Sequence, residues 1–194
     1  YYHHSTANSR TLVICLSSSG ATTRTIEAMM AARMAGAQSL TLSNTPGSTL
    51  MEEADRGILI HAQRKGWPTQ SSTAAMATLM QFLIEYAAAL GKDTQKIAAY
   101  RSALQDVPLL MKQVLEACKE PVLEIARREA QLPMYLFAGA GPCLGAAEFG
   151  SAKVKECSPD RAIAIQMEEF HHYNSLKAGD PLFILAPDGF SVPR

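Results

Sequence analysis

Short apolar runs alternate with amphipathic stretches in the first third of the chain. Residues Thr11–Leu16, "TLVICL", form a branched apolar run between turn residues, which is typical of a strand buried on both faces. The stretch "TTRTIEAMMAARMAG" then has helical spacing and ends at Gly36. The same alternation continues through "AQSLTLSNT", "GSTLMEEAD" and "RGILIHA", which predict a strand, a short helix capped by Ser48 or Thr49, and a third strand. This order indicates a parallel α/β sheet.

The middle of the chain is helical in pattern. Residues 71–90, "SSTAAMATLMQFLIEYAAAL", carry apolar side chains on more than one helical face. We therefore expect a helix that is buried between layers or at a subunit contact. The polar-patterned residues that follow predict a helical connector, in which Pro108 and Pro121 start or break helices.

The alternation of strand and helix returns in the last third. The stretch "PMYLFAGAGPCLGAAEFGSAKVKE" predicts a strand, a loop of small residues and a helix, and "RAIAIQ" and "DPLFILAP" predict two further strands. We expect two related three-layer αβα units with parallel sheets, of the flavodoxin-like or Rossmann-like kind. The predicted boundaries are 1–92 for the first domain, 93–131 for the connector and 132–194 for the second domain. Both units look incomplete, which predicts that the sequence is a piece of a longer protein.

Composition and charge narrow the classes of partner. The chain has 18 basic and 18 acidic residues, which argues against a nucleic-acid partner. No apolar run reaches the roughly 18–20 residues that cross a bilayer, and the first ten residues lack the apolar core of a signal peptide. The 4 cysteines show no CxxC spacing, which predicts reduced, mostly buried thiols and no metal site. We therefore expect a cytoplasmic protein without a membrane partner.

A group of hydroxyls follows the first predicted strand. Ser17, Ser18, Ser19 and Gly20 lie at its carboxyl end, where parallel α/β sheets bind ligands. The next helix begins near Thr22 and directs backbone N–H groups and its positive dipole end to the same place, which suits a phosphate. No lysine stands in the Walker position, so this is not a nucleotide P-loop. Ser and Thr are also ordinary helix caps, and the pattern alone leaves phosphate binding and capping both open.

Ionisable residues gather in a second stretch, "KVKECSPDRAIAIQMEEFHH". The end of the predicted helix and the residues after the next strand supply Lys153, Lys155, Glu156, Glu168, Glu169, His171 and His172. Their spacing is compatible with a solvated helix end and an acidic pair that faces water. It is also compatible with groups that transfer protons. The residues alone leave both interpretations open.

Several of these stretches resemble, in the right order, the sugar isomerase (SIS) domain family. "LSSSGATTRTIEA" is similar to the family's phosphate loop, S-x-S-G-x-[ST], and "LSNTPGSTLMEEAD" resembles N-x-x-G-S-x-L-x-x-x-[AS]-D. The helix that starts "SST" resembles the S-T-K helix, and "AKVKE" resembles K-[LV]-K-E. The family includes fructosamine-6-phosphate deglycases and the isomerase domain of glucosamine-6-phosphate synthase, which has two such domains in tandem. The resemblance therefore implies two SIS-type units here.

The resemblance also implies a substrate site. The residues that would bind the phosphate of a sugar phosphate are Ser17, Ser18, Ser19 and Thr22, with Ser18 acting through its backbone or its side chain. Ser72 matches the serine of the S-T-K motif, which lies near the sugar in the family. Ala74 stands where the lysine of that motif is usual.

The second stretch would supply the catalytic groups. By the resemblance, Glu156 takes the place of the proton-transfer glutamate and His172 that of the histidine that assists ring opening, with His171 as the competing choice. One carboxylate can move a proton between C1 and C2, histidine can shuttle the ring-oxygen proton, and Lys153 would stabilise the developing oxyanion. "HYN" replaces the usual H-G-P after the histidine. In relatives this histidine comes from the neighbouring subunit, which implies a homodimer with a shared active site.

The resemblance thus predicts an aldose–ketose sugar-phosphate isomerase or a fructosamine-6-phosphate deglycase that needs no metal or organic cofactor. A first alternative is a nucleotide-cofactor enzyme, because Gly139, Gly141 and Gly145 nearly form G-x-G-x-x-G, with one residue too many in the last gap. A second alternative is a regulator that senses a sugar phosphate without catalysis. Such a regulator would keep the serine loop and could lose the acid–base pair, so the presence of both Glu156 and His172 favours an enzyme.

Overall fold

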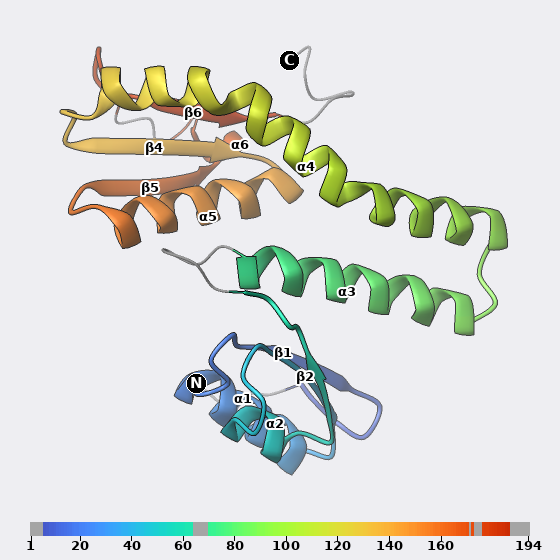
Figure 1. Ribbon diagram of the computed structural model, residues 1–194. Helices are drawn as coiled ribbons and strands as arrows, with labels where there is room; N and C mark the ends of the chain where they lie inside the picture. Colours follow the sequence, from blue (N-terminus) through green and yellow to red (C-terminus); the bar gives the residue numbers. More distant parts are fainter. Residues whose placement is uncertain (1–5, 64–69, 171, 173–175, 187–194) are drawn as a thin grey trace. The chain divides into compact units, whose positions relative to one another are not determined.

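The chain forms two compact units, Tyr1–Met111 and Lys112–Arg194, each with a parallel three-stranded sheet (Figure 1). This computed structural model describes residues 6–63, 70–170, 172 and 176–186. The predicted fold class, α/β with parallel sheets in two units, is confirmed. The boundaries expected at 92 and 131 stay a prediction.

The first unit alternates strands and helices along the chain. Its elements are β1 (Leu12–Leu16), α1 (Thr23–Met34), β2 (Gln38–Ser43), α2 (Thr49–Glu53) and β3 (Arg56–Leu59). The strands are parallel and lie in the order β1-β2-β3, so the carboxyl ends of all three meet at one edge. The central strand β2 has strands on both sides, and its last five residues are buried.

The core of this unit lies between the sheet and the two helices. Cys15 of β1, Met29 of α1 and Leu50 of α2 form one buried cluster, in which Met29 and Leu50 are fully buried. Full burial of a side chain of this size stabilises a fold by about 1.5–3 kcal/mol. Burial also raises the pKa of the Cys15 thiol. Cys118 and Cys157, in contrast, are exposed, so the expectation of mostly buried thiols was wrong.

Two long helices follow, α3 (Gln70–Ala89) and α4 (Thr94–Glu129). The start of α4 is tied to α3 by the guanidinium of Arg101, which donates hydrogen bonds to both carboxylate oxygens of Glu85. Ser71 and Ala75 are buried, but few other side chains of α3 are. Large apolar side chains in and just after α3 are exposed, namely Met76, Met80, Leu83, Tyr86 and Leu90. Of the two expectations for this helix, burial between layers was therefore wrong, and a subunit contact stays a prediction.

Helix α4 is one continuous helix of 36 residues, so the expected breaks at Pro108 and Pro121 do not occur. Each proline removes one i to i−4 hydrogen bond, which frees the carbonyls of Leu104 and Ala117. Both prolines are exposed, so water can satisfy the freed carbonyls. Helix-forming residues on either side continue the helix at a cost of about 3 kcal/mol per proline.

The second unit repeats the alternation with a different strand order. Its elements are β4 (Met134–Gly139), α5 (Pro142–Cys157), β5 (Arg161–Gln166), α6 (Met167–Phe170) and β6 (Leu182–Leu185). The order is β5-β4-β6, with β4 in the centre and all pairs parallel. The Phe137 and Phe183 rings stack with centroids 5.0 Å apart, and Gly150 lets α5 approach the Phe137 ring closely. None of the helices in the described ranges is long and apolar enough to cross a membrane.

Candidate functional site

The serine loop, residues 17–22, folds around the hydroxyl of Ser17. Ser17 directly follows β1, and its N–H donates to the Leu42 carbonyl at 3.1 Å, which extends the β1–β2 pairing by one residue. Its buried Oγ lies 2.8 Å from Thr22 Oγ1 and accepts a hydrogen bond from the Gly20 N–H at 3.1 Å. The loop therefore closes on itself at the carboxyl end of β1, immediately before α1.

Ser19 and Thr22 complete a row of hydroxyls at the start of α1. Ser19 is exposed, and its Oγ lies 3.5 Å from Ser17 Oγ and accepts from the Ala21 N–H at 3.3 Å. Thr22 is the N-cap residue of α1, but its side chain does not cap the helix. Its hydroxyl is engaged with Ser17 instead, so simple capping does not account for this residue.

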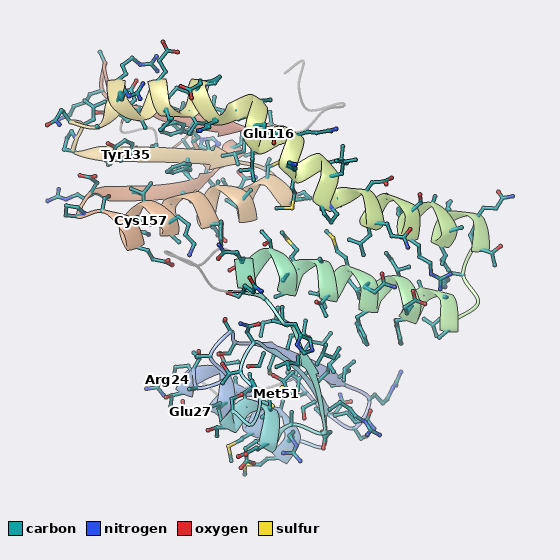
Figure 2. The ribbon with its side chains drawn as sticks, viewed as in Figure 1. Arg24, Glu27, Met51, Glu116, Tyr135 and Cys157 are labelled. Atoms are coloured by element: carbon teal, nitrogen blue, oxygen red, sulfur yellow. The ribbon has the colours of Figure 1, made fainter. Side chains whose placement is uncertain are left out.

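A charged pair lies near the start of α1. Arg24 Nη1 lies 2.6 Å from Glu27 Oε2, and both side chains are labelled on α1 in Figure 2. A pair of this kind at i and i+3 on a helix surface contributes a few tenths of a kcal/mol. The guanidinium next to the serine loop therefore has a carboxylate partner on its own helix.

Gly20 brings the loop into contact with the segment after β2. Its φ is +64°, and a Cβ at this position would lie 1.9 Å from Ser48 Oγ and 2.9 Å from Ser43 Oγ. The Gly20 carbonyl also accepts a hydrogen bond from the Leu50 N–H at 2.9 Å. Only glycine fits a left-handed backbone this close to neighbouring side chains.

Ser18 is held by the segment that follows β2. Its carbonyl accepts hydrogen bonds from the Asn44 N–H at 3.0 Å, from Thr45 Oγ1 at 3.2 Å and from Ser43 Oγ at 3.4 Å. The Ser18 Oγ is buried and has no hydrogen-bond partner among the residues that the structure describes. Ser18 thus fixes the loop to the segment after β2.

The structure brings together one group of the predicted substrate residues but leaves one residue apart. The grouped residues are Ser17, Ser18, Ser19 and Thr22. Ser72 lies in the first turn of α3 and is exposed, whereas its neighbour Ser71 is buried. Within the described ranges no hydrogen bond connects Ser72 with the serine loop.

Lys153 and Glu156, two of the predicted catalytic residues, lie together near the end of α5. Lys153 Nζ is 2.6 Å from Glu156 Oε2, and the same ammonium lies 5.1 Å from the centroid of the Phe149 ring. The Glu156 side chain is 49% exposed, so the carboxylate remains accessible although it is paired. A lysine in this position can stabilise negative charge that develops beside the carboxylate.

His172 and Glu156 lie at opposite edges of the sheet of the second unit. His172 follows α6, is exposed, and its N–H donates to the Glu169 carbonyl at 2.9 Å, while His171 lies outside the described residues. Helix α5 leads from the carboxyl end of β4 to the amino end of β5, so Glu156 lies at the amino edge. His172 comes after β5, at the carboxyl edge. A strand of 6 residues at about 3.3 Å per residue puts roughly 17 Å between the two edges.

Two residues that the sequence analysis did not select lie at the carboxyl edge of the first sheet. The Asn44 amide pairs with both backbone groups of Ala62, with Nδ2 donating to the carbonyl at 2.8 Å and Oδ1 accepting from the N–H at 2.6 Å. His61, just before Ala62, has a φ of +58°. Asn44 is the asparagine of the N-x-x-G-S stretch, which was the available signal, whereas no pattern in the sequence marked His61.

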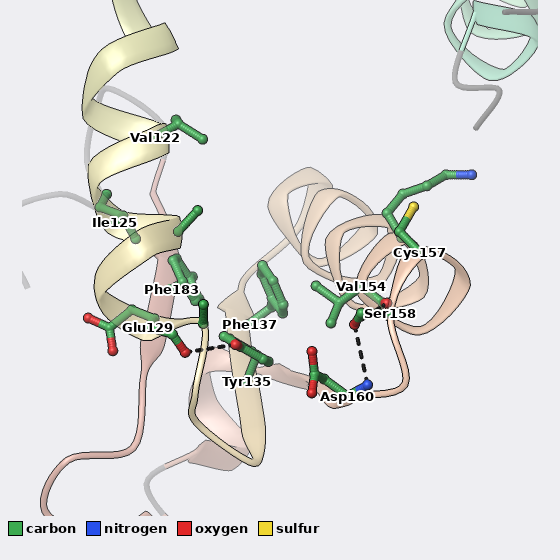
Figure 3. Close-up of a pocket in the computed structure, with 13 residues that line it drawn as sticks. Val122, Ile125, Glu129, Tyr135, Phe137, Val154, Cys157, Ser158, Asp160 and Phe183 are labelled. Carbon is green, nitrogen blue, oxygen red and sulfur yellow. Dashed lines mark hydrogen bonds between the residues drawn. The ribbon is translucent and has the colours of Figure 1, made fainter. Parts of the chain in front are cut away.

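A cavity of about 500 Å³ lies in the second unit between α4 and α5 (Figure 3). Much of its lining is apolar and includes Val122, Ile125, Phe137, Val154 and Phe183. The Tyr135 hydroxyl donates to the Glu129 carbonyl at 2.8 Å, and burial, followed by the charges of Asp160 and Glu129, raises the pKa of Tyr135. Tyr135 and Asp160 lie near the starts of β4 and β5, so the cavity is at the amino edge, opposite the end where α/β sheets usually bind ligands.

Metal chemistry has no candidate ligand set in the parts of the chain that the structure describes. No group of three or more His, Cys, Asp or Glu side chains is arranged there to hold an ion.

Comparison with known proteins gives concordant results in sequence and structure. Residues 2–85 match the SIS domain family. The chain is 32% identical to the glutamine–fructose-6-phosphate aminotransferase (isomerizing) of Halobacterium salinarum, over 84% of the chain and 27% of that relative. It is 28% identical to the protein of the same name from Corynebacterium glutamicum, over 96% of the chain and 30% of that relative. The chain therefore spans less than a third of the length of these curated relatives.

Two of the solved structures that share the fold of this chain illustrate the match. The C-terminal domain of glucosamine-fructose-6-phosphate aminotransferase from Francisella tularensis has a TM-score of 0.85 at 23% identity, and the match covers 92% of this chain and 51% of that one. Glucosamine-6-phosphate deaminase from Thermotoga maritima has a TM-score of 0.67 at 15% identity, with 94% and 54% covered. At these identities the similarity establishes the fold.

Proposed function

Because this chain belongs to the SIS domain family, through residues 2–85, we propose that its serine loop binds the phosphate group of a sugar phosphate. The observation that carries the proposal is the row of hydroxyls from Ser19 through Ser17 to Thr22, which lies at the carboxyl end of β1 and directly before α1. Hydroxyl donors and the N–H groups at a helix N-terminus are suited to the oxygens of a phosphate. The names of two relatives, a glutamine–fructose-6-phosphate aminotransferase and a glucosamine-6-phosphate deaminase, support the same chemistry.

The proposed reaction is isomerisation of a sugar phosphate between aldose and ketose, or cleavage of a fructosamine 6-phosphate. Both reactions pass through an enediol or enediolamine, in which one base moves a proton between adjacent carbons. Glu156 is the proposed base, and Lys153, which lies 2.6 Å from it, stabilises the developing oxyanion. His172 assists ring opening by moving the proton of the ring oxygen.

The strand directions of the second unit support a site shared between two copies of the chain. Glu156 and His172 lie at opposite edges of one sheet, roughly 17 Å apart along a strand of 6 residues. One copy of this unit therefore cannot present both groups to the same sugar. In a symmetric dimer, each site takes Glu156 from one chain and His172 from the other. The exposed apolar side chains of α3 suit a role in the contact between the chains.

A sugar-phosphate sensor without catalysis is the second candidate. Two departures from the family pattern favour it, because Ala74 replaces the usual lysine and "HYN" replaces H-G-P. A sensor requires the serine loop, but it does not require Glu156 or His172.

The test is an activity assay of the complete protein with fructose 6-phosphate, glucosamine 6-phosphate and a set of fructosamine 6-phosphates. The variants are Glu156→Gln, His172→Ala and Ser19→Ala. We expect turnover of one substrate class and a loss of about 100-fold or more in the first two variants, as for other acid–base groups. Absence of turnover, with phosphosugar binding that survives the first two changes and fails in Ser19→Ala, would establish the sensor instead.

A further inference from the structure

The carboxyl edge of the first sheet carries a second structured segment beside the serine loop. The chain leaves β3 through Ile60, His61 and Ala62, and the Ile60 N–H donates to the Ser43 carbonyl at 2.9 Å. Strand β2 lies between β1 and β3, so the carboxyl ends of β1 and β3 are two strand spacings apart, or about 10 Å. A ligand whose phosphate occupies the serine loop has its carbon skeleton within reach of this segment.

Asn44 fixes this segment to the serine loop. Its backbone N–H donates to the Ser18 carbonyl at 3.0 Å, and its side-chain amide makes two hydrogen bonds to the backbone of Ala62, at 2.8 and 2.6 Å. A side-chain amide bound to both groups of one peptide residue replaces the pairing that a further strand residue would make. Asn44 therefore links the segment that follows β1 to the segment that follows β3.

His61 is held in an unusual conformation by these contacts. With φ at +58° it is a non-glycine residue in the left-handed region, which L-residues adopt rarely and only where neighbouring contacts hold the backbone. Its side chain is exposed. Such residues concentrate at functional sites, where an unfavourable backbone geometry directs a side chain.

We infer that His61 is a specificity-determining residue that recognises the hydroxyls of the sugar, and that Asn44 is its positioning residue. The inference rests on the proposed phosphate site, because the serine loop fixes where the sugar begins. A neutral imidazole has one hydrogen-bond donor and one acceptor, which suits vicinal hydroxyl groups. The phosphate itself depends on the serine loop and does not require His61.

The test compares two ligands that differ only in the sugar, inorganic phosphate and fructose 6-phosphate. Both are titrated by NMR into this chain and into its His61→Gly variant. Glycine accepts a φ of +58° without strain, so the variant removes the side chain while the fold keeps or gains stability. We expect the affinity for fructose 6-phosphate to fall about fivefold or more, as for the loss of one or two hydrogen bonds. The affinity for phosphate should stay within about twofold.

Three further variants separate the causes. Asn44→Ala keeps the backbone link to Ser18 but removes the clamp on Ala62, so it should weaken fructose 6-phosphate binding and spare phosphate binding. Arg56→Ala is the matched control, because Arg56 is exposed at the amino end of β3, the strand that precedes His61. This variant should change neither affinity. Ser19→Ala should weaken the binding of both phosphate and fructose 6-phosphate.

The outcomes distinguish the inference from the function on which it rests. If phosphate binding depends on Ser19 but His61→Gly binds fructose 6-phosphate as tightly as the unaltered chain, the role of His61 is wrong and the phosphate site stands. If the unaltered chain binds neither ligand, or Ser19→Ala changes nothing, the phosphate site is wrong and the inference fails with it.

Discussion

At the scale of single residues, Gly20 determines whether the serine loop can keep its shape. Alanine at this position would combine a left-handed backbone with a Cβ 1.9 Å from Ser48 Oγ, so the loop or α2 must shift. Gly91→Ala is a matched control, because Gly91 has a φ of +67° and no atom within 4 Å of the added Cβ. We expect both variants to lose about 1 kcal/mol or more from backbone strain. Only Gly20→Ala should lose a further 1–3 kcal/mol, roughly, and phosphate binding.

Urea unfolding and phosphate titration of both variants measure these losses. Equal destabilisation of the two variants, with phosphate binding retained in Gly20→Ala, would show that the contact with Ser48 does not set the loop.

Asp55 provides a second residue-scale prediction, on the dependence of stability on pH. The hydrogen bond from the Ser39 hydroxyl, then that from the Ser39 N–H, and then the charge of Arg33 lower the pKa of this carboxyl. A carboxyl with a lowered folded-state pKa stabilises the fold above its unfolded pKa of about 3.9 and loses that effect as the pH falls through the folded value. The stability difference between the unaltered chain and Asp55→Asn should therefore be constant near neutrality and shrink below about pH 4.

Urea unfolding of the two chains at a series of pH values tests this. Ser39→Ala, which removes the largest cause of the shift, should flatten the profile. A difference that does not change with pH would contradict the assignment to Asp55.

At the scale of elements, the two prolines of α4 should make the helix less stable than its sequence would otherwise allow. Pro108 and Pro121 are both exposed and interior to one continuous helix. Replacing either by alanine restores a backbone hydrogen bond in a helix interior, where the two residues differ by about 3 kcal/mol. We expect each variant to gain about 1–3 kcal/mol in the free energy of unfolding. Unfolding followed by circular dichroism at 222 nm measures the change, and a loss of stability in either variant would mean that the proline is required for the packing of α4.

The same elements show what sequence patterns can predict here. Strands such as β1 and β2 and the helices between them follow from short buried runs and helical spacing, which are local properties. The continuity of α4 depends on whether water reaches the carbonyls freed by Pro108 and Pro121, which is a property of the folded chain. The different strand order of the second unit is likewise a matter of packing between distant segments.

The sequence likewise predicts one part of the candidate site and misses another. The position of the serine loop followed from its place between a strand and a helix. Its contacts did not, because the pairing of Thr22 with Ser17 and the hydrogen bond from the Asn44 N–H to the Ser18 carbonyl are properties of the folded chain. His61 carries no motif, and only its backbone conformation distinguishes it.

At the scale of the whole molecule, the separation of Glu156 and His172 makes a prediction about mixtures of inactive chains. If each active site takes Glu156 from one chain and His172 from the other, Glu156→Gln and His172→Ala chains are each inactive alone. In a mixed dimer, one of the two sites combines the unaltered Glu156 with the unaltered His172. Random exchange of equal amounts makes half of the dimers mixed, so about a quarter of the original activity should return.

The measurement is turnover of the substrate identified for the complete protein, before and after the two variants are unfolded together and refolded. A matched control mixes Glu156→Gln with Lys153→Ala. These two residues lie 2.6 Å apart on one helix and belong to the same half-site, so no mixed dimer contains an intact site and no activity should return. Recovery in the control, or none in the test mixture, would contradict a shared site. The shared site is proposed because the strand directions leave Glu156 and His172 of one chain at opposite edges of the sheet.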